Sequence, residues 1–282
     1  MSLTAPPQES ATGEITMSDS EFQRVAQRVS DMAGIVLEPH KRQMIVSRLS
    51  RRLRARSLDD IGTYLDYLDK GADRQELQEF LNTLTTNLTS FFRETHHFRH
   101  LERHVFGAMR EKKASKMRIW SAGCSSGEEP YSIALTALET FGGMPSDFKI
   151  LATDLDTNML DRGRAGIYPI ERVADTDKRF SRQFRQQPGG ETVKLPAATM
   201  SAISFRQLNL LESWPMQGPF DAIFCRNVMI YFNAETKARL IDRFAEILVP
   251  GGFLYLGHSE SILGEHPRLT NCGETTYQRK PS

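Results

Sequence analysis

A loop of small residues followed by two acids is the segment of this sequence whose residue types point most directly to chemistry. Residues 119–132 read Ile-Trp-Ser-Ala-Gly-Cys-Ser-Ser-Gly-Glu-Glu-Pro-Tyr-Ser, which predicts a strand, a tight loop and a helix that begins near Pro130. Small residues let a ligand approach the backbone closely. The GxGxxG pattern is absent, and Glu128 and Glu129 stand where the pyrophosphate of a dinucleotide would meet the helix N-terminus. A cationic ligand therefore fits this loop better than a phosphate.

S-adenosylmethionine is a cationic ligand of that kind, because it carries a positive sulfonium and an ammonium group that a glutamate at this loop can hold. The alternative is that Glu128 and Glu129 only stabilise the positive end of the helix dipole. The loop by itself leaves both interpretations open.

Two further strand ends carry polar side chains. Asp154 follows a predicted strand over 148–153 and lies 27 positions after Gly127. In nucleoside-binding α/β folds, an acid roughly 20 residues after the glycine turn binds the ribose hydroxyls, which makes Asp154 the candidate. Capping of the next helix is the other possible role, and we favour it for Asp156. Arg226 and Asn227 follow a third apolar strand, at the sheet edge where active sites of this architecture gather.

The elements that must position these groups fall into two parts. Residues 18–85 contain four segments with apolar residues at helical intervals, and the first begins with a capping-box pair, Ser18 and Glu21. These residues predict an all-helical N-terminal domain. From residue 117 strands and helices alternate, which predicts an α/β fold with a doubly wound, mainly parallel sheet of the Rossmann-like type.

Weaker patterns fill the remaining parts of the chain. We expect a disordered lead-in over residues 1–17, and a linker and helix over 86–116. Within the 117–282 domain, a Pro-Gly-Gly turn at 188–190 and short strand-like stretches at 192–195 and 202–205 predict a small antiparallel β subdomain, inserted at about 167–206. A second Pro-Gly-Gly, at 250–252, predicts a turn. A predicted helix precedes this turn, and a predicted strand over 253–256 follows it.

The composition is that of an ordinary globular chain, with 39% hydrophobic and 25% charged residues among 282. The net charge of +1 gives no overall attraction to nucleic acid or acidic membranes. Three widely spaced cysteines and seven histidines without a HExxH pattern lead us to expect no metal. There is no secretory signal pattern and no apolar run of the ~20 residues that a membrane span needs, so we expect a cytoplasmic protein without membrane insertion.

One predicted helix is strongly basic. Residues 39–58 contain seven basic residues and no acid, and Lys41, Arg48, Arg52 and Arg56 share one face beside an apolar row. A solvated helix face is the commonest reason for such a pattern. Binding of nucleic-acid phosphates and docking against an acidic helix bundle are the two functional alternatives.

Three segments taken together resemble the bacterial chemotaxis receptor (MCP) glutamate O-methyltransferases, the CheR family. They are Leu84–Glu94, Ser126–Ser132 and Phe220–Phe232, and Gly257–Glu260, which reads Gly-His-Ser-Glu, adds to the match. The resemblance extends over almost the whole chain from about Ser18. It implies a helical domain followed by a Rossmann-like S-adenosylmethionine-dependent methyltransferase domain with an inserted antiparallel β subdomain, the same parts that the patterns predict.

The resemblance also implies an activity and a set of site residues. Such enzymes use S-adenosylmethionine, leaving S-adenosylhomocysteine, to methylate glutamates on the cytoplasmic helices of chemoreceptors. By resemblance, nine residues of this chain contact the cofactor: Asn87, Thr89, Arg93, Glu129, Asp154, Asn209, Leu210, Arg226 and Asn227. Arg93 and Tyr231 are the expected catalytic residues. The family often has alanine where this chain has Gly123 and Cys124, which are also small.

Methylation of a glutamate requires alignment more than proton transfer. The ordinary pKa of a glutamate side chain is about 4.3, so roughly one in 500 is protonated near pH 7 and no general base is needed. We expect an in-line displacement in which orientation supplies ~7–11 kcal/mol. Arg93 is expected to hold the incoming carboxylate through an imperfect pairing that preserves its nucleophilicity, while Tyr231 orients it or faces the methyl group.

The resemblance favours the chemoreceptor as partner and receptor docking as the role of the basic face. In some family members the β subdomain also binds a short tail at the receptor's C-terminus, and the sequence leaves this open for the present chain. We expect a monomer that does not bind nucleic acid.

Two rival functions remain. One is methylation of a nucleic acid or a small molecule on the same fold; against base N-methylation, Cys225-Arg226-Asn227 replaces the Asn/Asp-Pro-Pro-aromatic motif. The other is an adaptor without turnover, which the complete set of site residues disfavours.

Overall fold

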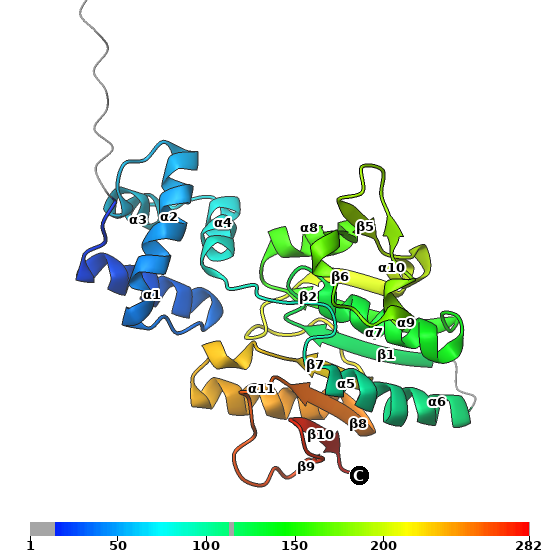
Figure 1. Cartoon of the computed structure of the whole chain (residues 1–282). Helices are drawn as coiled ribbons and strands as arrows, with labels where there is room; N and C mark the ends of the chain where they lie inside the picture. The colour runs from blue at the N-terminus through cyan, green and yellow to red at the C-terminus, as the bar shows by residue number, and fades with distance from the viewer. Residues whose placement is uncertain (1–14, 113–115, 282) are drawn as a thin grey trace, which may run out of the picture. The chain divides into compact units, whose positions relative to one another are not determined.

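The computed structural model describes residues 15–112 and 116–281, so most of the expected lead-in, residues 1–14, lies outside the described residues. The chain divides into two compact units (Figure 1). The first contains the residues up to Arg28 together with Leu37–Leu84, and the second contains Val29–Val36 and the chain from Thr85 onward. Met17, the last residue of the expected lead-in, is buried, so that end of the prediction is wrong.

Within residues 15–84 the four predicted helices are present. They are α1 (Asp19–Ala33), α2 (Arg42–Arg56), α3 (Ile61–Asp69) and α4 (Arg74–Leu84), and a 3₁₀ turn over Pro39–Lys41 precedes α2. The capping box forms as expected, because Ser18 Oγ donates to Glu21 Oε2 at 2.7 Å and Glu21 N donates to Ser18 Oγ at 3.3 Å.

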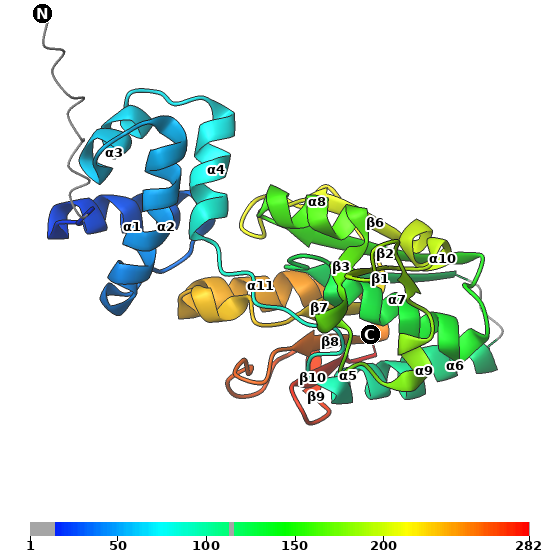
Figure 2. The same cartoon turned by 45° about the horizontal axis from the view of Figure 1, so that its top comes forward.

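Helix α2 is the centre of the helical unit. It lies between α3 and α4 in both views (Figures 1 and 2). Its apolar row, Ile45, Leu49 and Leu53, is fully buried. The period of these residues is that of one helix face, which explains why the sequence pattern located this core.

The second unit is built on a seven-stranded sheet among the described residues, with strand order β6-β2-β1-β7-β8-β10-β9. The first five strands in this order run parallel, and β10 is antiparallel to both β8 and β9. The strands are β1 (Lys116–Ala122), β2 (Asp147–Asp154), β6 (Ile203–Gln207), β7 (Phe220–Cys225), β8 (Leu248–Leu256), β9 (Leu269–Asn271) and β10 (Thr276–Arg279). The predicted doubly wound, mainly parallel sheet is confirmed.

Helices cover both faces of this sheet. They are α5 (Thr95–His100), a π-helical turn (Leu101–Phe106), α6 (Gly107–Glu111), α7 (Glu128–Phe141), α8 (Thr157–Ala165) and α11 (Ala234–Ile247). Successive strand residues point to opposite faces, so Ile119 packs in the core under α5–α8 and Trp120 packs in the core under α11. The described residues contain no helix that is both long and apolar enough to cross a membrane.

The insertion holds a three-stranded antiparallel sheet of order β3-β5-β4, as predicted. Its strands are β3 (Ile167–Pro169), β4 (Arg185–Gln186) and β5 (Thr192–Lys194), with a 3₁₀ turn (Ile170–Arg172) and α9 (Lys178–Ser181) between the first two. The expected strand at 202–205 does not belong to it. After α10 (Ala197–Ala202), β6 instead pairs in parallel with β2 at the edge of the main sheet.

The second Pro-Gly-Gly sequence is not a free turn, and that prediction is wrong. Strand β8 begins at Leu248 and runs through it. In the pairing with β7, Phe220 faces Leu248 and Ala222 faces Phe253, so four residues of β8 bulge opposite one residue of β7. The bulge places the glycines inside a strand, which local sequence signals cannot reveal.

Candidate active site

The loop after β1 is tied to the end of β2. Gly123 N and Cys124 N both donate to Thr153 O, at 2.8 and 2.9 Å. Gly127 has a φ of +97°, and a Cβ there would lie 2.8 Å from the Tyr168 hydroxyl, so glycine is required for both conformation and space. The loop therefore brings the N-terminus of α7 to the carboxyl edge of the sheet.

Glu128 and Glu129 are both buried at this N-terminus. Glu129 accepts from Ser121 Oγ at 2.6 Å and pairs with Arg226 Nη1 at 3.0 Å. Burial raises the pKa of Glu129, and Arg226 opposes that rise. Glu128 Oε2 accepts from Ser126 Oγ at 2.7 Å. Its Oε1 is buried without a hydrogen-bond partner among the described residues and lies 3.6 Å from Arg172 Nη1, with which it forms an ion pair.

Asp154 lies at the end of β2, as predicted, and next to the glycine loop. Its Oδ2 accepts from Ser125 N at 2.7 Å, and its Oδ1 accepts from Asp156 N at 2.9 Å. Burial raises the pKa of Asp154 to about 6. Leu155 N also donates to this carboxylate, so three of its roughly four lone-pair sites are used and one is left for a ligand hydroxyl. Asp156 caps α8 by accepting from Asn158 N and Met159 N, which confirms the capping role expected for it.

Arg226 joins acids from two different elements. Its Nη1 pairs with Glu129, and its Nη2 lies 3.2 Å from Glu94 Oε2. Glu94 Oε1 in turn accepts from His258 N at 3.3 Å and lies 2.9 Å from His258 Nδ1. Burial disfavours ionisation of Glu94, but Arg226 and His258 outweigh it and hold its pKa at about 2. The buried guanidinium of Arg226 thus links Glu129, on α7, to Glu94, which directly precedes α5.

The linker residues reach the same edge of the sheet. Asn87 Nδ2 donates to Asp156 Oδ2 at 2.7 Å, and Asn87 O accepts from Ser125 Oγ at 3.1 Å. Thr89 O accepts from Arg172 Nη1 at 2.9 Å. These contacts hold the linker against the glycine loop, the start of α8 and the 3₁₀ turn after β3.

Arg93 is half-buried, and its Nη1 donates to Leu88 O at 2.8 Å. Its backbone oxygen accepts from Arg226 Nη2. The backbone of Arg93 therefore adjoins the Glu94–Arg226–Glu129 network, while part of the donor edge of its guanidinium has no partner among residues 15–112 and 116–281.

Asn209 and Leu210, two residues expected at the cofactor, have structural roles here. Asn209 Nδ2 donates to Met32 O at 2.8 Å, and its Oδ1 accepts from Leu211 N at 3.1 Å. Leu210 is buried in the core under α11. Cofactor contact by these two residues stays a prediction.

Asn227 and Tyr231 lie on the short segment that follows β7. Asn227 has a φ of +58°, and a 3₁₀ turn over Met229–Tyr231 comes next. Asn227 N and Ile230 N both donate to the carboxylate of Glu260, at 2.8 and 3.1 Å. Sequence reasoning gave no role to Glu94 or Glu260; the only signal for the latter was its place in the Gly-His-Ser-Glu motif.

The chemistry of this donor set fits S-adenosylmethionine. Three buried carboxylates, Glu128, Glu129 and Asp154, gather at the ends of β1 and β2. Glu128 Oε1 accepts no hydrogen bond among the described residues and has only the 3.6 Å ion pair with Arg172, so it offers an acceptor for a cationic group, and Asp154 offers an acceptor for a hydroxyl. A phosphate-bearing cofactor would meet three carboxylates in the same place, and the guanidinium of Arg226 is already engaged by Glu129 and Glu94.

Three side chains with metal-ligating atoms lie together beside this network. Glu94, His96 and His97 offer ligand atoms within 4.8 Å of one another, a grouping that the sequence patterns did not indicate. Burial and the charge of Arg226 lower the pKa of His97 to about 3. Because Arg226 occupies Glu94 and repels a cation, we assign no metal role to the group.

The basic face of α2 is partly internal. Arg52 Nε donates to Glu76 Oε1 at 2.8 Å and Arg56 Nε donates to Glu76 Oε2 at 2.5 Å, while Tyr64 Oη also donates to this fully buried carboxylate. Burial disfavours ionisation of Glu76, but the three donors outweigh it and hold its pKa at about 2.

Arg48, a third member of the predicted docking face, donates through Nη1 to Leu84 O at 3.0 Å. The exposed cations of the helix include Arg51 and Arg54. Docking through Lys41, Arg48, Arg52 and Arg56 stays a prediction, although two of these side chains hold the helical unit together.

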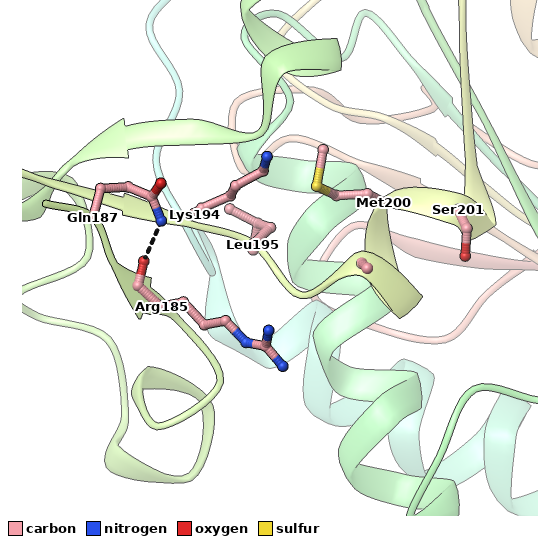
Figure 3. A pocket seen from close by; sticks show the side chains of 7 residues that line it. Arg185, Gln187, Lys194, Leu195, Met200 and Ser201 are labelled. Atoms are coloured by element: carbon pink, nitrogen blue, oxygen red, sulfur yellow. Dashed lines mark hydrogen bonds between the residues drawn. The ribbon is translucent and has the colours of Figure 1, made fainter.

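The β subdomain contains a pocket with a volume of about 680 Å³. Figure 3 shows side chains from β4, β5 and α10 around it. The lining residues are Arg185, Gln187, Lys194, Leu195, Ala197, Met200 and Ser201. Two of them are cations and none is an acid, so the pocket suits an anionic group.

Comparison with known proteins identifies the family. The family model described as "CheR methyltransferase, SAM binding domain" matches residues 87–278, and the model described as "CheR methyltransferase, all-alpha domain" matches residues 20–85.

Curated relatives match over nearly the same length. The chain is 43% identical over 270 residues to the "Chemotaxis protein methyltransferase" of Escherichia coli (strain K12), covering 94% of this chain and 93% of that protein. It is 40% identical over 276 residues to "Chemotaxis protein methyltransferase 2" of Pseudomonas aeruginosa, covering 94% of both. The "Chemotaxis protein methyltransferase" of Borreliella burgdorferi is 37% identical over 272 residues, covering 94% of this chain and 96% of that protein.

The cofactor inferred from the acids of the glycine loop is thus S-adenosylmethionine, the ligand for which the matching domain is described. The chain belongs to the CheR family of S-adenosylmethionine-dependent chemotaxis methyltransferases.

Proposed function

We propose that this enzyme methylates glutamate side chains on the cytoplasmic helices of chemoreceptors and so forms glutamyl methyl esters for chemotaxis adaptation. The observation that carries the proposal is the position of Arg93. Its backbone oxygen accepts from Arg226 of the buried acid network, and its guanidinium, which donates to Leu88 O, keeps further donors without a partner among the described residues. A planar fork of donors at this place suits an incoming carboxylate.

In the proposed reaction the protein has to align the acceptor carboxylate with the methyl group of the cofactor. Near pH 7 the target glutamate is already ionised, so none of the buried acids has to act as a base. Bound S-adenosylmethionine supplies an electrophilic methyl group on a sulfonium. Arg93 holds the attacking carboxylate and Tyr231 orients it, and orientation of this kind can contribute ~7–11 kcal/mol.

Cofactor binding is assigned to the groups at the ends of β1, β2 and β7. Glu129 and Glu128 Oε1, which accepts no hydrogen bond among the described residues, face the cationic end, and Asp154 binds the ribose hydroxyls. Arg226 prevents the acids from repelling one another by pairing with Glu129 and Glu94. Asn87, Thr89 and Asn227 complete the proposed contacts, with Asn209 and Leu210 contributing through their backbone.

Receptor docking is assigned to the cations of α2. Because Arg52 and Arg56 are engaged by Glu76, Arg51 and Arg54 are better placed to meet an acidic receptor helix. The enzyme is proposed to act as a monomer in the cytoplasm.

We also assign the pocket of the β subdomain to a short receptor tail. Arg185 and Lys194 face each other across β4 and β5 and line the pocket. Charge of this sign attracts a peptide that carries acids or a terminal carboxylate.

One labelling experiment separates this function from its rivals. The purified protein is incubated with methyl-labelled S-adenosylmethionine and receptor-rich membranes. Label that alkali releases as methanol supports a glutamyl ester. Alkali-stable label would indicate a nitrogen or other acceptor, and absence of label would indicate an adaptor; either result contradicts the proposal.

A further inference from the structure

The Glu260 carboxylate accepts hydrogen bonds from three backbone N–H groups. Oε2 accepts from Asn227 N at 2.8 Å and from Gly257 N at 2.7 Å, and Oε1 accepts from Ile230 N at 3.1 Å. Glu260 is only 5% exposed. Hydrogen bonds to a charged acceptor are roughly twice as strong as neutral ones, so this carboxylate ties two chain segments together.

The segment that Glu260 holds carries two of the proposed site residues. Strand β7 ends at Cys225, and Asn227 then adopts the left-handed conformation that favours glycine. The next residues form the 3₁₀ turn that ends with Tyr231. The N–H groups of this segment no longer pair with a neighbouring strand, and two of them donate to the Glu260 carboxylate instead.

The turn that carries Glu260 is fixed by its own hydrogen bond and by contacts with Glu94 and Asn227. Glu260 N donates to Gly257 O at 2.8 Å, which closes a tight turn after β8. His258 contacts Glu94, the neighbour of Arg93. A Cβ at Gly257 would lie 2.4 Å from Asn227 Nδ2, so the turn packs directly on the segment after β7.

We propose that Glu260 is a positioning residue for methyl transfer, which fixes the Asn227–Tyr231 segment so that Asn227 faces the cofactor and Tyr231 faces the acceptor carboxylate. The inference rests on the proposed function. Glu260 acts through the backbone and touches neither reactant. A displacement of about 1 Å at a reacting centre can cost 10²-fold in rate, so loosening this segment reduces turnover without unfolding the protein.

Three variants of the full-length protein test the proposal. Glu260→Gln preserves size and one carbonyl acceptor but turns an NH₂ group toward at least one backbone N–H. Glu260→Ala removes every acceptor. Glu265→Gln makes the same chemical change at a nearby exposed position and is the matched control. The readouts are kcat and KM, the Kd of S-adenosylhomocysteine, the melting temperature, and hydrogen exchange at the Asn227 and Ile230 amides.

We expect Glu260→Gln to lower kcat roughly 10-fold and Glu260→Ala roughly 100-fold. The Kd of S-adenosylhomocysteine should rise by a smaller factor than kcat falls, and exchange at both amides should accelerate. Glu265→Gln should match the wild type in every readout.

A folded Glu260→Gln variant with unchanged kcat and unchanged amide exchange would overturn the proposal. So would a loss of kcat equal to the loss of folded protein, because a merely structural role would produce it. If the wild type methylates no glutamate, the proposed function is wrong; unchanged amide exchange in Glu260→Gln would then separately refute the positioning role.

Discussion

The buried carboxyl of Asp154 makes cofactor affinity depend on pH. Burial raises its pKa to about 6, although hydrogen bonds from Asp156 N and Ser125 N favour the ionised form. When the group is ionised, the carboxylate only accepts hydrogen bonds and can accept one from a ribose hydroxyl, whereas protonation turns one of its oxygens into a donor. S-adenosylhomocysteine should therefore bind the ionised form and bind more weakly as the pH falls through about 6.

The size of the effect follows from that pKa. If only the ionised form binds, the apparent Kd is multiplied by 1 + 10^(pKa − pH), which is about 11 at pH 5 and about 1.1 at pH 7. We thus expect affinity roughly tenfold weaker at pH 5 than at pH 7, equivalent to about 1.4 kcal/mol.

Calorimetric titration with S-adenosylhomocysteine between pH 5 and pH 8 measures this directly. Asp154→Asn should bind weakly at every pH and lose the dependence, while Asp161→Asn, at an exposed position, should behave as the wild type. A flat wild-type profile would refute the reasoning. A profile that persists in Asp154→Asn would also refute it, and would point to Glu129, whose pKa burial also raises.

Three further predictions concern the acceptor, the docking face and the helical unit. Arg93→Ala should lower kcat by about 100-fold in receptor methylation assays, because the acceptor carboxylate loses its orienting partner. The double change Arg51→Glu and Arg54→Glu should slow receptor methylation severalfold at low salt without altering cofactor affinity, as measured by calorimetry. Glu76→Ala should lower the free energy of unfolding, measured in urea titrations, by about 3 kcal/mol. This value is near the lower end of the cost of breaking a buried ion pair, because the side chains of Arg52 and Arg56 are partly exposed to water. The lowered pKa of Glu76 also means that its stabilisation is complete above about pH 4.5 and is lost as the pH falls toward 2.

Each of these predictions has a result that would contradict it. Near-normal turnover in Arg93→Ala with normal cofactor binding would show that another residue holds the acceptor. Equal methylation rates for the wild type and the variant with both Arg51→Glu and Arg54→Glu would show that the receptor does not dock on α2. For Glu76, Glu79→Ala on the same helix provides the comparison, and equal loss of stability in both variants would contradict the role given to the buried network.

Short-range patterns predicted the elements well, because their signals lie within a few residues. The capping box at Ser18 and Glu21 and the buried row Ile45, Leu49 and Leu53 are of this kind. The acids of the glycine loop and Asp154 could also be located, since the carboxyl ends of parallel strands meet at one edge.

The errors come from pairings between distant parts of the chain. The residues of β6 pattern like a hairpin strand, but their partner is β2, which lies some 50 residues earlier. Arg52 and Arg56 look like a surface stripe until α4 places Glu76 beside them. Glu260 owes its role to backbone N–H groups of a segment 30 to 33 residues away, and no spacing rule indicates such a contact.

A crystal structure with S-adenosylhomocysteine tests the central claim most directly, since the claim is that the acids at the ends of β1 and β2 hold the cofactor. We predict the ribose hydroxyls at the Asp154 carboxylate and the amino end of the ligand beside Glu128 and Glu129. Ligand density elsewhere on the sheet, with these three carboxylates uncontacted, would contradict the account.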